Sequence, residues 1–332
     1  MWALEWEGQV LVVDAGLMFP HEEMLGVDLV LPDPTYLLDG GRRVLGIVLT
    51  HGHEDHIGGL PFLLKRLDAP VFGTAITLGL ARPRLREHRI LREADLRTIR
   101  LGDRVQLGPF RVETVPVAHS IPDAAALAIE TPVGRVVYTG DFKLELDPPW
   151  GRATDVERLR RLGDEGVLLL LSDSTNAERE GWSGSERELL PRFERIFDEA
   201  PGRIVVATFA SNIHRIQLVV RLAAQHGRHV ALAGRSLRNA FSTARELGHL
   251  DVPDGLVVRL EDATEDQRLV LLTAGSQGEP VSALSRFAAR RHPVVNVRDG
   301  DWVVISARPI PGNERMVHHT IDNLYRNGAA RV

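Results

Sequence analysis

Short apolar runs in the first part of the chain predict buried strands, and polar turns separate them. Two runs cover 9–13 and 44–49, and a short strand is also predicted at 70–73. Behind the turn that follows the second run, apolar side chains recur with the spacing of one helix face, at Leu60, Leu63, Leu64 and Leu67. This spacing predicts an amphipathic helix. Another helix is expected from Thr74, and segment 17–39, rich in proline, glycine and acidic residues, predicts a long ordered loop.

Strand-length apolar stretches dominate between residues 95 and 141. The predicted strands are 96–101, 105–107, 110–117, 126–130 and 135–139, with glycine-containing turns between several of them. Two of these strands lead into candidate metal ligands, His119 and Asp141. A histidine or an aspartate at a strand end is usually an ordinary loop residue, so neither position is informative alone.

The second half of the chain alternates strand-like and helix-like segments. The predicted strands are 168–171, which we expect to be buried, and 203–207, 229–233, 269–272 and 302–306. Predicted helices cover 185–200 and 213–225 and follow 234–236, 273–280 and 309–313. This alternation predicts a parallel sheet with helices on both faces, in which ligands bind at the carboxyl ends of the strands. The polar turns, and a glycine- and serine-containing loop that could hold an anion, lie at those ends.

The turn at 50–56, Thr-His-Gly-His-Glu-Asp-His, concentrates three histidines and an aspartate between a predicted strand and a predicted helix. In the simplest interpretation it is a polar turn in which Asp55 caps the helix. A metal site explains the density of ligands better, because imidazole and carboxylate are ligand types that suit Zn²⁺. His119 would add a third imidazole to one metal, and Asp141 a carboxylate that bridges two.

Composition narrows the functional classes. The 332 residues suggest about two domains, and the net charge of −5 argues against a general electrostatic nucleic-acid binder, although not against a local basic groove. The arginine-rich segment 82–104 is interpreted as a solvated face, with an RNA groove as the alternative. The absence of cysteine excludes disulfides and thiolate ligands. No stretch resembles a signal peptide or is apolar for long enough to span a bilayer, so we expect a cytoplasmic protein that does not bind membranes.

The ligand pattern, His51-x-His53-x-Asp55-His56 followed by His119 and Asp141, resembles the metallo-β-lactamase superfamily. Asp14 is similar to the supporting aspartate of that family's first motif. The resemblance implies an α/β fold, a metallo-β-lactamase αββα sandwich, with a two-zinc site at one edge.

Further stretches resemble the bacterial ribonuclease J family, which carries an inserted β-CASP domain built on a parallel α/β sheet. They are 17–20, 50–61, 119–123, 139–143, 172–177, 207–216, 275–280 and 309–314. The resemblance implies a metallo-β-lactamase domain at 1–180 and a β-CASP domain at 181–332. It also implies a zinc-dependent ribonuclease that acts 5′→3′ as an exonuclease and as an endonuclease in mRNA decay and rRNA maturation. Its substrate would be single-stranded RNA with a 5′-monophosphate, and its relatives form dimers or tetramers, with a monomer left open here.

The resemblance assigns roles by position. One zinc would be held by His51, His53 and His119, the second by Asp55 and His56, and Asp141 would bridge them; Asp55, Asp141 and Asp173 would be catalytic. RNA contacts are expected at Phe209, Ser211, His214, Arg215, Arg235, Ser236, Ser276 and Gly278. Local alternatives remain for several of these: Asp173 could be a cap, His214 a polar helix start, Phe209 a core residue, and either arginine part of a surface ion pair.

Two features of the family are missing from this sequence. The family has a glycine-rich first strand before the position of Met1, and two further histidines after the insert, a general acid and a zinc ligand. We therefore expect a fragment whose second zinc site lacks one ligand. A non-catalytic RNA-binding fragment and a small-molecule hydrolase of the same superfamily are the alternative functions, the latter disfavoured by the long insert from about residue 182.

Overall fold

The computed structural model describes residues 1–20, 24–310 and 312–332. It divides into two compact units, Met1–Ser185 and Glu186–Val332, each of which is described by itself. Part of the expected loop at 17–39, residues 21–23, lies outside the described residues. The same is true of Pro311 in the 309–314 stretch.

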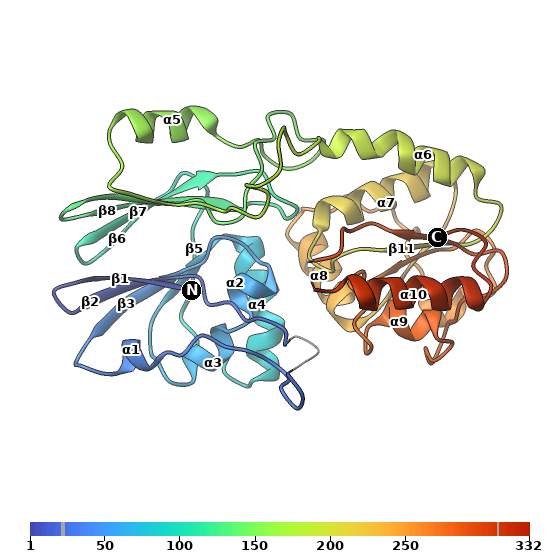
Figure 1. The fold of residues 1–332 in the computed structure, drawn as a ribbon, viewed down its shortest axis with the longest axis horizontal. Helices are drawn as coiled ribbons and strands as arrows, with labels where there is room; N and C mark the ends of the chain where they lie inside the picture. Colours follow the sequence, from blue (N-terminus) through green and yellow to red (C-terminus); the bar gives the residue numbers. More distant parts are fainter. Residues whose placement is uncertain (21–23, 311) are drawn as a thin grey trace. The chain divides into compact units, whose positions relative to one another are not determined.

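One sheet of the first unit has the strand order β1-β2-β3-β4-β5 (Figure 1). A hairpin joins β1 (Trp2–Trp6) to β2 (Gln9–Val13), and the remaining strands run parallel to β2: β3 (Arg43–Val48), β4 (Val71–Gly73) and β5 (Leu96–Thr98). Side chains alternate along β2, so that Val10 and Val12 enter one core while Leu11 and Val13 enter another. Both faces of this sheet are therefore covered.

The other sheet of the first unit is mainly antiparallel. Its strands, in sheet order, are β10 (Leu169–Leu171), β9 (Gly134–Tyr138), β8 (Ala125–Thr131), β7 (Phe110–Pro116) and β6 (Arg104–Leu107), and only the β10–β9 pair is parallel. Phe110 and Leu127 from this sheet pack with Leu11 and Phe72 from the first. The two sheets thus share one hydrophobic core.

Helices form the outer layers of this unit. The first sheet carries α3 (Leu60–Leu64) and α4 (Ala75–Glu87), whose apolar side chains join those of Val10 and Val12, and the short α1 (Thr35–Leu38) and α2 (Glu54–Ile57) lie on the same sheet. The second sheet is covered by α5 (Val156–Asp164) (Figure 1). These four layers confirm the expected αββα sandwich.

The second unit contains one parallel sheet, of order β12-β13-β11-β14. Its strands are β11 (Ile204–Ala207), β12 (Val230–Ala233), β13 (Val270–Thr273) and β14 (Trp302–Ile305). Its helices are α6 (Leu190–Glu199), α7 (Ile213–Gln225), α8 (Arg235–Glu246), α9 (Ala283–Ala288) and α10 (Glu314–Arg326), with 3₁₀ turns η1 (Glu186–Leu189) and η2 (Leu260–Asp262). One sheet face packs on Phe287 of α9 and Leu324 of α10. The predicted parallel α/β arrangement is confirmed.

Several local predictions were wrong. The sequence analysis did not predict β1, α1 or α5, and the helix expected to reach Leu67 ends at Leu64. Strand 168–171 was expected to be buried, but Leu168, Leu169 and Leu170 are 61%, 48% and 59% exposed. The physical reason is that β10 is an edge strand, paired only with β9 among the described residues.

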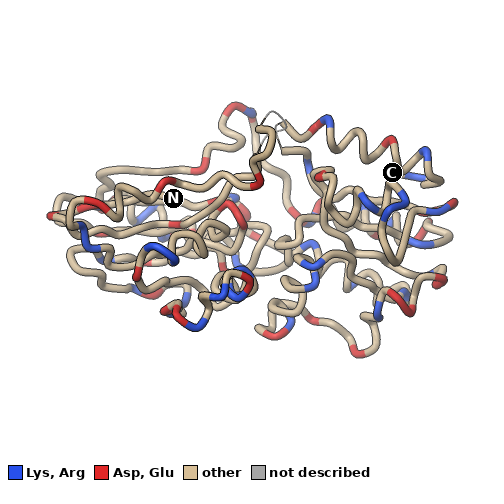
Figure 2. Tube along the Cα trace, turned by 90° about the horizontal axis from the view of Figure 1, so that it is seen from below, with Lys and Arg blue, Asp and Glu red and all other residues tan. Residues whose placement is uncertain are grey.

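The arginine-rich segment 82–104 agrees with the interpretation of a solvated face. Arg84 pairs with Glu54, and Arg97 pairs with the neighbouring Asp95. Figure 2 shows basic and acidic positions interspersed along both units. Within the described part of the chain, no helix combines the length and the apolar character that crossing a bilayer requires.

Candidate metal centre

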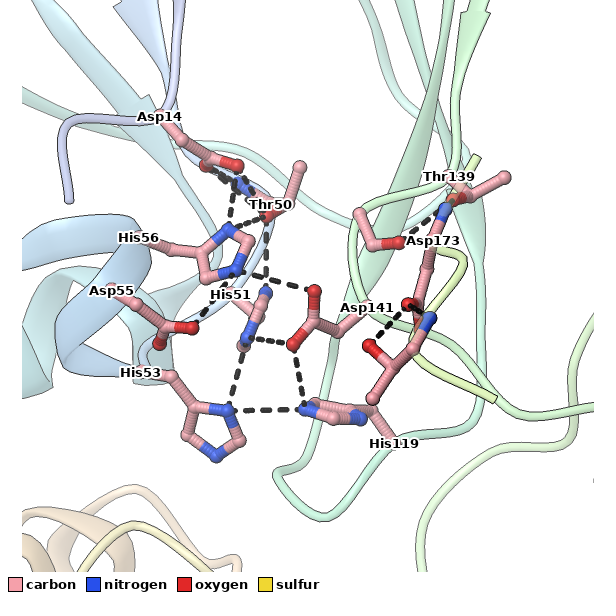
Figure 3. A network of polar contacts seen from close by, with 12 residues as sticks. Asp14, Thr50, His51, His53, Asp55, His56, His119, Thr139, Asp141 and Asp173 are labelled. Carbon is pink, nitrogen blue, oxygen red and sulfur yellow. Dashed lines mark hydrogen bonds and ion pairs between the residues drawn. The ribbon is translucent and has the colours of Figure 1, made fainter. Parts of the chain in front are cut away.

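Three strand ends of the first unit carry the candidate ligands. The turn after β3 ends at His53, the residue before α2, so Asp55 and His56 lie in the first turn of that helix. His119 follows β7, and Asp141 follows β9. Figure 3 shows their side chains converging on one region, with Asp141 between the histidines.

Backbone hydrogen bonds hold these strand ends together. The amide of Ala125 donates to the carbonyl oxygen of Thr50 at 3.1 Å, which joins β8 to the end of β3. The amide of Lys143 donates to the carbonyl oxygen of Ala118 at 2.9 Å, which joins the segments that carry Asp141 and His119. The positions of the ligands are therefore set by the sheets rather than by loops alone.

The first set of ligand atoms comes from His51, His53, His119 and Asp141, within 4.8 Å of one another. Nδ1 of His53 lies 3.1 Å from Nε2 of His51 and 3.1 Å from Nε2 of His119. A tetrahedral ion with metal–nitrogen distances of about 2.0–2.1 Å would separate its ligand nitrogens by about 3.3–3.4 Å. The donor types and spacings of this set therefore fit a zinc-like ion.

The second set comprises Asp55, His56 and Asp141. Nε2 of His56 lies 3.3 Å from Oδ1 of Asp141 and 3.7 Å from Oδ2 of Asp55. The other oxygen of Asp141, Oδ2, lies 3.9 Å from Nε2 of both His51 and His119. Each carboxylate oxygen of Asp141 thus faces one set, an arrangement in which this side chain could serve as a ligand to both.

Burial and neighbouring charges affect the histidine pKa values of the two sets differently. Burial lowers the pKa of His51 and of His53 well below the ordinary value, and lowers that of His119, so these imidazoles are neutral ligands at pH 7. Burial also lowers the pKa of His56, but hydrogen bonds to Asp14 and Asp141 outweigh it and raise this pKa to about 10. Binding of a metal by the second set must therefore release a proton from His56.

Asp14 supports the centre from the end of β2, as the sequence pattern suggested. Its Oδ2 lies 2.7 Å from Nδ1 of His56, and its Oδ1 accepts the amide hydrogen of Thr50 at 2.8 Å. Asp14 is buried and adopts a φ of 56°, a conformation that non-glycine residues rarely adopt. The strained backbone aims the carboxylate at the ligand-bearing turn.

Asp173 lies on the segment that follows β10. Its amide donates to Oγ1 of Thr139 at 2.9 Å, and its Oδ1 accepts from the amide and hydroxyl of Thr175 at 2.8 and 2.7 Å. The negative charge of Asp173 also acts on His119, whose pKa it raises against the larger effect of burial. Asp173 therefore caps a turn and faces the first set as well.

The candidate RNA-contact residues gather at the carboxyl ends of the parallel strands of the second unit. Phe209, which is 38% exposed, and Ser211 follow β11, with His214 in the first turn of α7. Arg235 and Ser236 are exposed in the first turn of α8. The arrangement leaves these five side chains at least partly accessible.

Two other candidates are buried. Arg215 is 7% exposed, and its guanidinium pairs with Glu186 at 2.7 Å and donates to Ser306. Gly278 is buried where a Cβ atom would lie 2.5 Å from the backbone of Met316. Because Gly278 has no side chain, the backbone of α10 can pack closely against it. Ser276 is also buried, but its Oγ has no hydrogen-bond partner among the described residues.

Sequence analysis assigned no role to four residues around the ligands. Oγ of Ser120 lies 3.2 Å from Nε2 of His53, and Arg84 donates to Glu54 beside the ligand turn. Thr50 contacts both Asp14 and His51. The sequence could have pointed to Thr50, Glu54 and Ser120, because each of them is next to a candidate ligand in the chain.

Comparisons with known proteins agree with this geometry. The family description "Metallo-beta-lactamase superfamily" matches residues 1–190, and "Ribonuclease J, beta-CASP domain" matches residues 201–324. Proteins named ribonuclease J are 45% identical over 329 residues in Synechocystis sp. and 44% identical over 330 residues in Thermus thermophilus. These alignments cover 98% and 97% of this chain but 51% and 57% of the relatives, so the chain spans about half their length.

A solved structure shares the fold. The crystal structure of a protein of unknown function from Enterococcus faecalis V583 aligns with a TM-score of 0.67 at 18% sequence identity. The alignment covers 99% of this chain and 83% of that chain.

Proposed function

Because the chain belongs to the metallo-β-lactamase superfamily and is homologous to ribonuclease J, we propose that it carries the catalytic centre of a metal-dependent ribonuclease. The reaction is hydrolysis of RNA phosphodiester bonds in the cytoplasm, by 5′→3′ exonucleolytic and by endonucleolytic cleavage in mRNA decay and rRNA maturation. The observation that carries the proposal is the pair of ligand sets that share Asp141, in a chain whose second unit matches the β-CASP domain of ribonuclease J.

The donor sets support zinc as the metal. The first set offers three imidazoles and one carboxylate, and the second offers one imidazole and two carboxylates. Imidazole-rich sites suit zinc, whereas carboxylate and water ligands suit manganese or magnesium. We therefore propose zinc in the first set and the same ion, held by fewer nitrogen ligands, in the second.

Ions at these positions would supply an activated water and neutralise charge that develops on the phosphate oxygens. The side chain of Asp55 is 66% exposed, so it can orient a nucleophile that approaches from solvent while one of its oxygens ligates. Asp141 connects the two sets, because one of its oxygens points toward each of them. Asp173 keeps the segment beside His119 in place and adds negative charge there.

RNA contacts are proposed at the accessible side chains of the second unit. Phe209 is sufficiently exposed to stack on a base, and such stacking tolerates any sequence. Ser211, His214, Arg235 and Ser236 would contact phosphates of a single strand that begins with a 5′-monophosphate. The hydroxyl of Ser276 is a further candidate, because a buried hydroxyl without a partner in the described chain lacks the hydrogen bond that a phosphate could supply.

The test is cleavage of a 5′-monophosphorylated single-stranded RNA by the purified chain reconstituted with zinc. His53→Ala should abolish cleavage and reduce the zinc content. His229→Ala is the matched control, because His229 is an exposed histidine of the second unit that pairs only with Asp266 in the described chain. Equal cleavage by wild type and His53→Ala would contradict the proposal. RNA binding by the zinc-loaded wild type without cleavage would instead support the binding-fragment alternative.

A further inference from the structure

Thr50 occupies a position that connects both ligand sets to one carboxylate (Figure 3). It follows Leu49 in the turn after β3, and its side chain is fully buried. Its Oγ1 lies 3.0 Å from Oδ2 and 3.1 Å from Oδ1 of Asp14, 3.1 Å from Nδ1 of His51 and, more distantly, 3.4 Å from Nδ1 of His56. A buried hydroxyl close to four polar atoms has a defined hydrogen-bonding arrangement.

The single hydrogen of the hydroxyl fixes that arrangement. Carboxylate oxygens accept hydrogen bonds, so the contact between Thr50 and Asp14 requires the hydroxyl hydrogen to point at Asp14. The hydroxyl oxygen is then left to accept, and Nδ1 of His51 must carry the hydrogen that it accepts. If the hydroxyl hydrogen pointed at Nδ1 of His51 instead, Oγ1 would face two carboxylate oxygens in a buried site, with no hydrogen between them.

This arrangement determines which nitrogen of His51 is free. With a hydrogen on Nδ1, the neutral imidazole has its lone pair on Nε2. Nε2 is the atom that faces the first set, 3.1 Å from Nδ1 of His53 and 3.9 Å from Oδ2 of Asp141. The hydroxyl of Thr50 thus selects the tautomer in which His51 can ligate.

The same carboxylate orients a ligand of the second set directly. Oδ2 of Asp14 lies 2.7 Å from Nδ1 of His56, whose Nε2 faces Asp141. The amide of Thr50 also donates to Oδ1 of Asp14, which fixes the plane of the carboxylate. One aspartate is therefore coupled to an imidazole of each set, directly to His56 and through a hydroxyl to His51.

We propose that Thr50 is a positioning residue that sets the tautomer and orientation of His51, so that Asp14 controls one ligand in each metal set. The proposal rests on the metal site proposed above and not on the identity of the substrate. Substitution of a residue that holds a ligating histidine by its second nitrogen typically lowers metal affinity by about 10–100-fold. The effect of Thr50 should fall on the first set, whereas that of Asp14 should fall on both.

The test is stepwise zinc affinity, measured by competition with a chromophoric chelator. Thr50→Val keeps the shape of the side chain and removes the hydroxyl, so one of the two zinc affinities should fall by about 10–100-fold. Thr50→Ser restores the hydroxyl and should return that affinity to within about 3-fold of wild type. Asp14→Asn should weaken both. Melting of each variant in excess chelator reports folding separately from metal binding.

A second measurement needs no variant. Long-range ¹H–¹⁵N correlations of the imidazole in zinc-loaded wild type should show hydrogen on Nδ1 of His51. Hydrogen on Nε2 would overturn the proposal, as would wild-type affinities in Thr50→Val or a Thr50→Ser protein as weak as Thr50→Val. If wild type itself binds no zinc, the proposed metal site fails as well, which separates the two conclusions.

Discussion

Gly16 and Asp55 approach so closely that no side chain fits between them. A Cβ atom built on Gly16 would lie 1.5 Å from the carbonyl oxygen of Asp55, far inside any allowed contact. The surrounding segment follows α2 closely, since the amide of Ala15 donates to the carbonyl oxygen of His56 at 2.7 Å. The position of a proposed ligand of the second set therefore depends on a glycine in a different strand-end segment.

Gly16→Ala should displace Asp55 and weaken metal binding by the second set. Because the contact involves backbone atoms on both sides, we expect a loss of at least about 2 kcal/mol in the free energy of unfolding. Elemental analysis should find less than the wild-type zinc content after dialysis, and chemical denaturation gives the stability. Gly163→Ala is the control, since that glycine lies in α5 with nothing within 4 Å of a built Cβ. Wild-type zinc content in Gly16→Ala would contradict the prediction.

Asp141→Asn should impair both sets together. The change keeps the size of the side chain but removes the charge of the one carboxylate that the two ligand sets share in the described structure. Loss of a residue that hydrogen-bonds to a metal ligand lowers metal affinity by about 10–100-fold. Loss of a ligand that both sets share should therefore lower zinc affinity by at least about 100-fold. Titration calorimetry with zinc measures this. Asp164→Asn, an exposed aspartate of α5, should bind zinc like wild type; tight binding of two zinc ions by Asp141→Asn would show that Asp141 does not bridge.

Asp301→Ala should destabilise the second unit strongly. Arg203 and Asp301 form an ion pair in which each side chain is only 2% exposed. Removing the aspartate leaves a buried guanidinium without its charge partner, at a cost of about 3–5 kcal/mol. Urea unfolding followed by circular dichroism measures the change. Glu199→Gln removes an exposed partner of Arg331 and should change stability by less than about 1 kcal/mol, so equal effects of the two substitutions would contradict this account.

The ligand turn could be predicted because its residues are close in the sequence and lie at a strand end. Short apolar runs likewise identified β2 and β7. The role of Thr50 could not be predicted, because it depends on Asp14 from another strand. The local pattern shows that a threonine precedes a histidine, but not which carboxylate its hydroxyl contacts.

The incorrect predictions have the same physical origin. The pairing of Arg215 with Glu186 was not predicted either, because Glu186 lies in a different element. The apolar run at 168–171 resembled a core strand, although its place at a sheet edge leaves most of it exposed. The helix α5 was missed because Leu162 is its one buried residue, and an ion pair also connects it to the sheet.

That ion pair joins Arg158 of α5 to Glu113 of β7. Nε of Arg158 donates to Oε1 of Glu113 at 2.6 Å, and its second nitrogen, Nη2, donates to Oε2 at 3.0 Å. The side chains are 17% and 15% exposed, so water screens the pair only partly. The hydrogen bonds from Arg158 lower the pKa of Glu113 below its ordinary value of 4.5, and burial opposes them less strongly.

Glu113→Gln should therefore destabilise the protein in a pH-dependent way. A carboxyl group whose pKa is lower in the folded state stabilises that state above its unfolded pKa, and this contribution is lost as the pH falls through the folded value. We expect a deficit of about 1 kcal/mol at pH 7 that shrinks below pH 4.5, where the unfolded side chain takes up a proton. The deficit vanishes once the pH falls below the folded pKa, where folded wild type also carries an uncharged side chain. Urea unfolding of both proteins in chelator, between pH 7 and pH 3, measures the difference without a contribution from metal. A deficit that stays constant down to pH 3 would show that the charge of Glu113, which also pairs with Arg104 of β6, does not stabilise the fold.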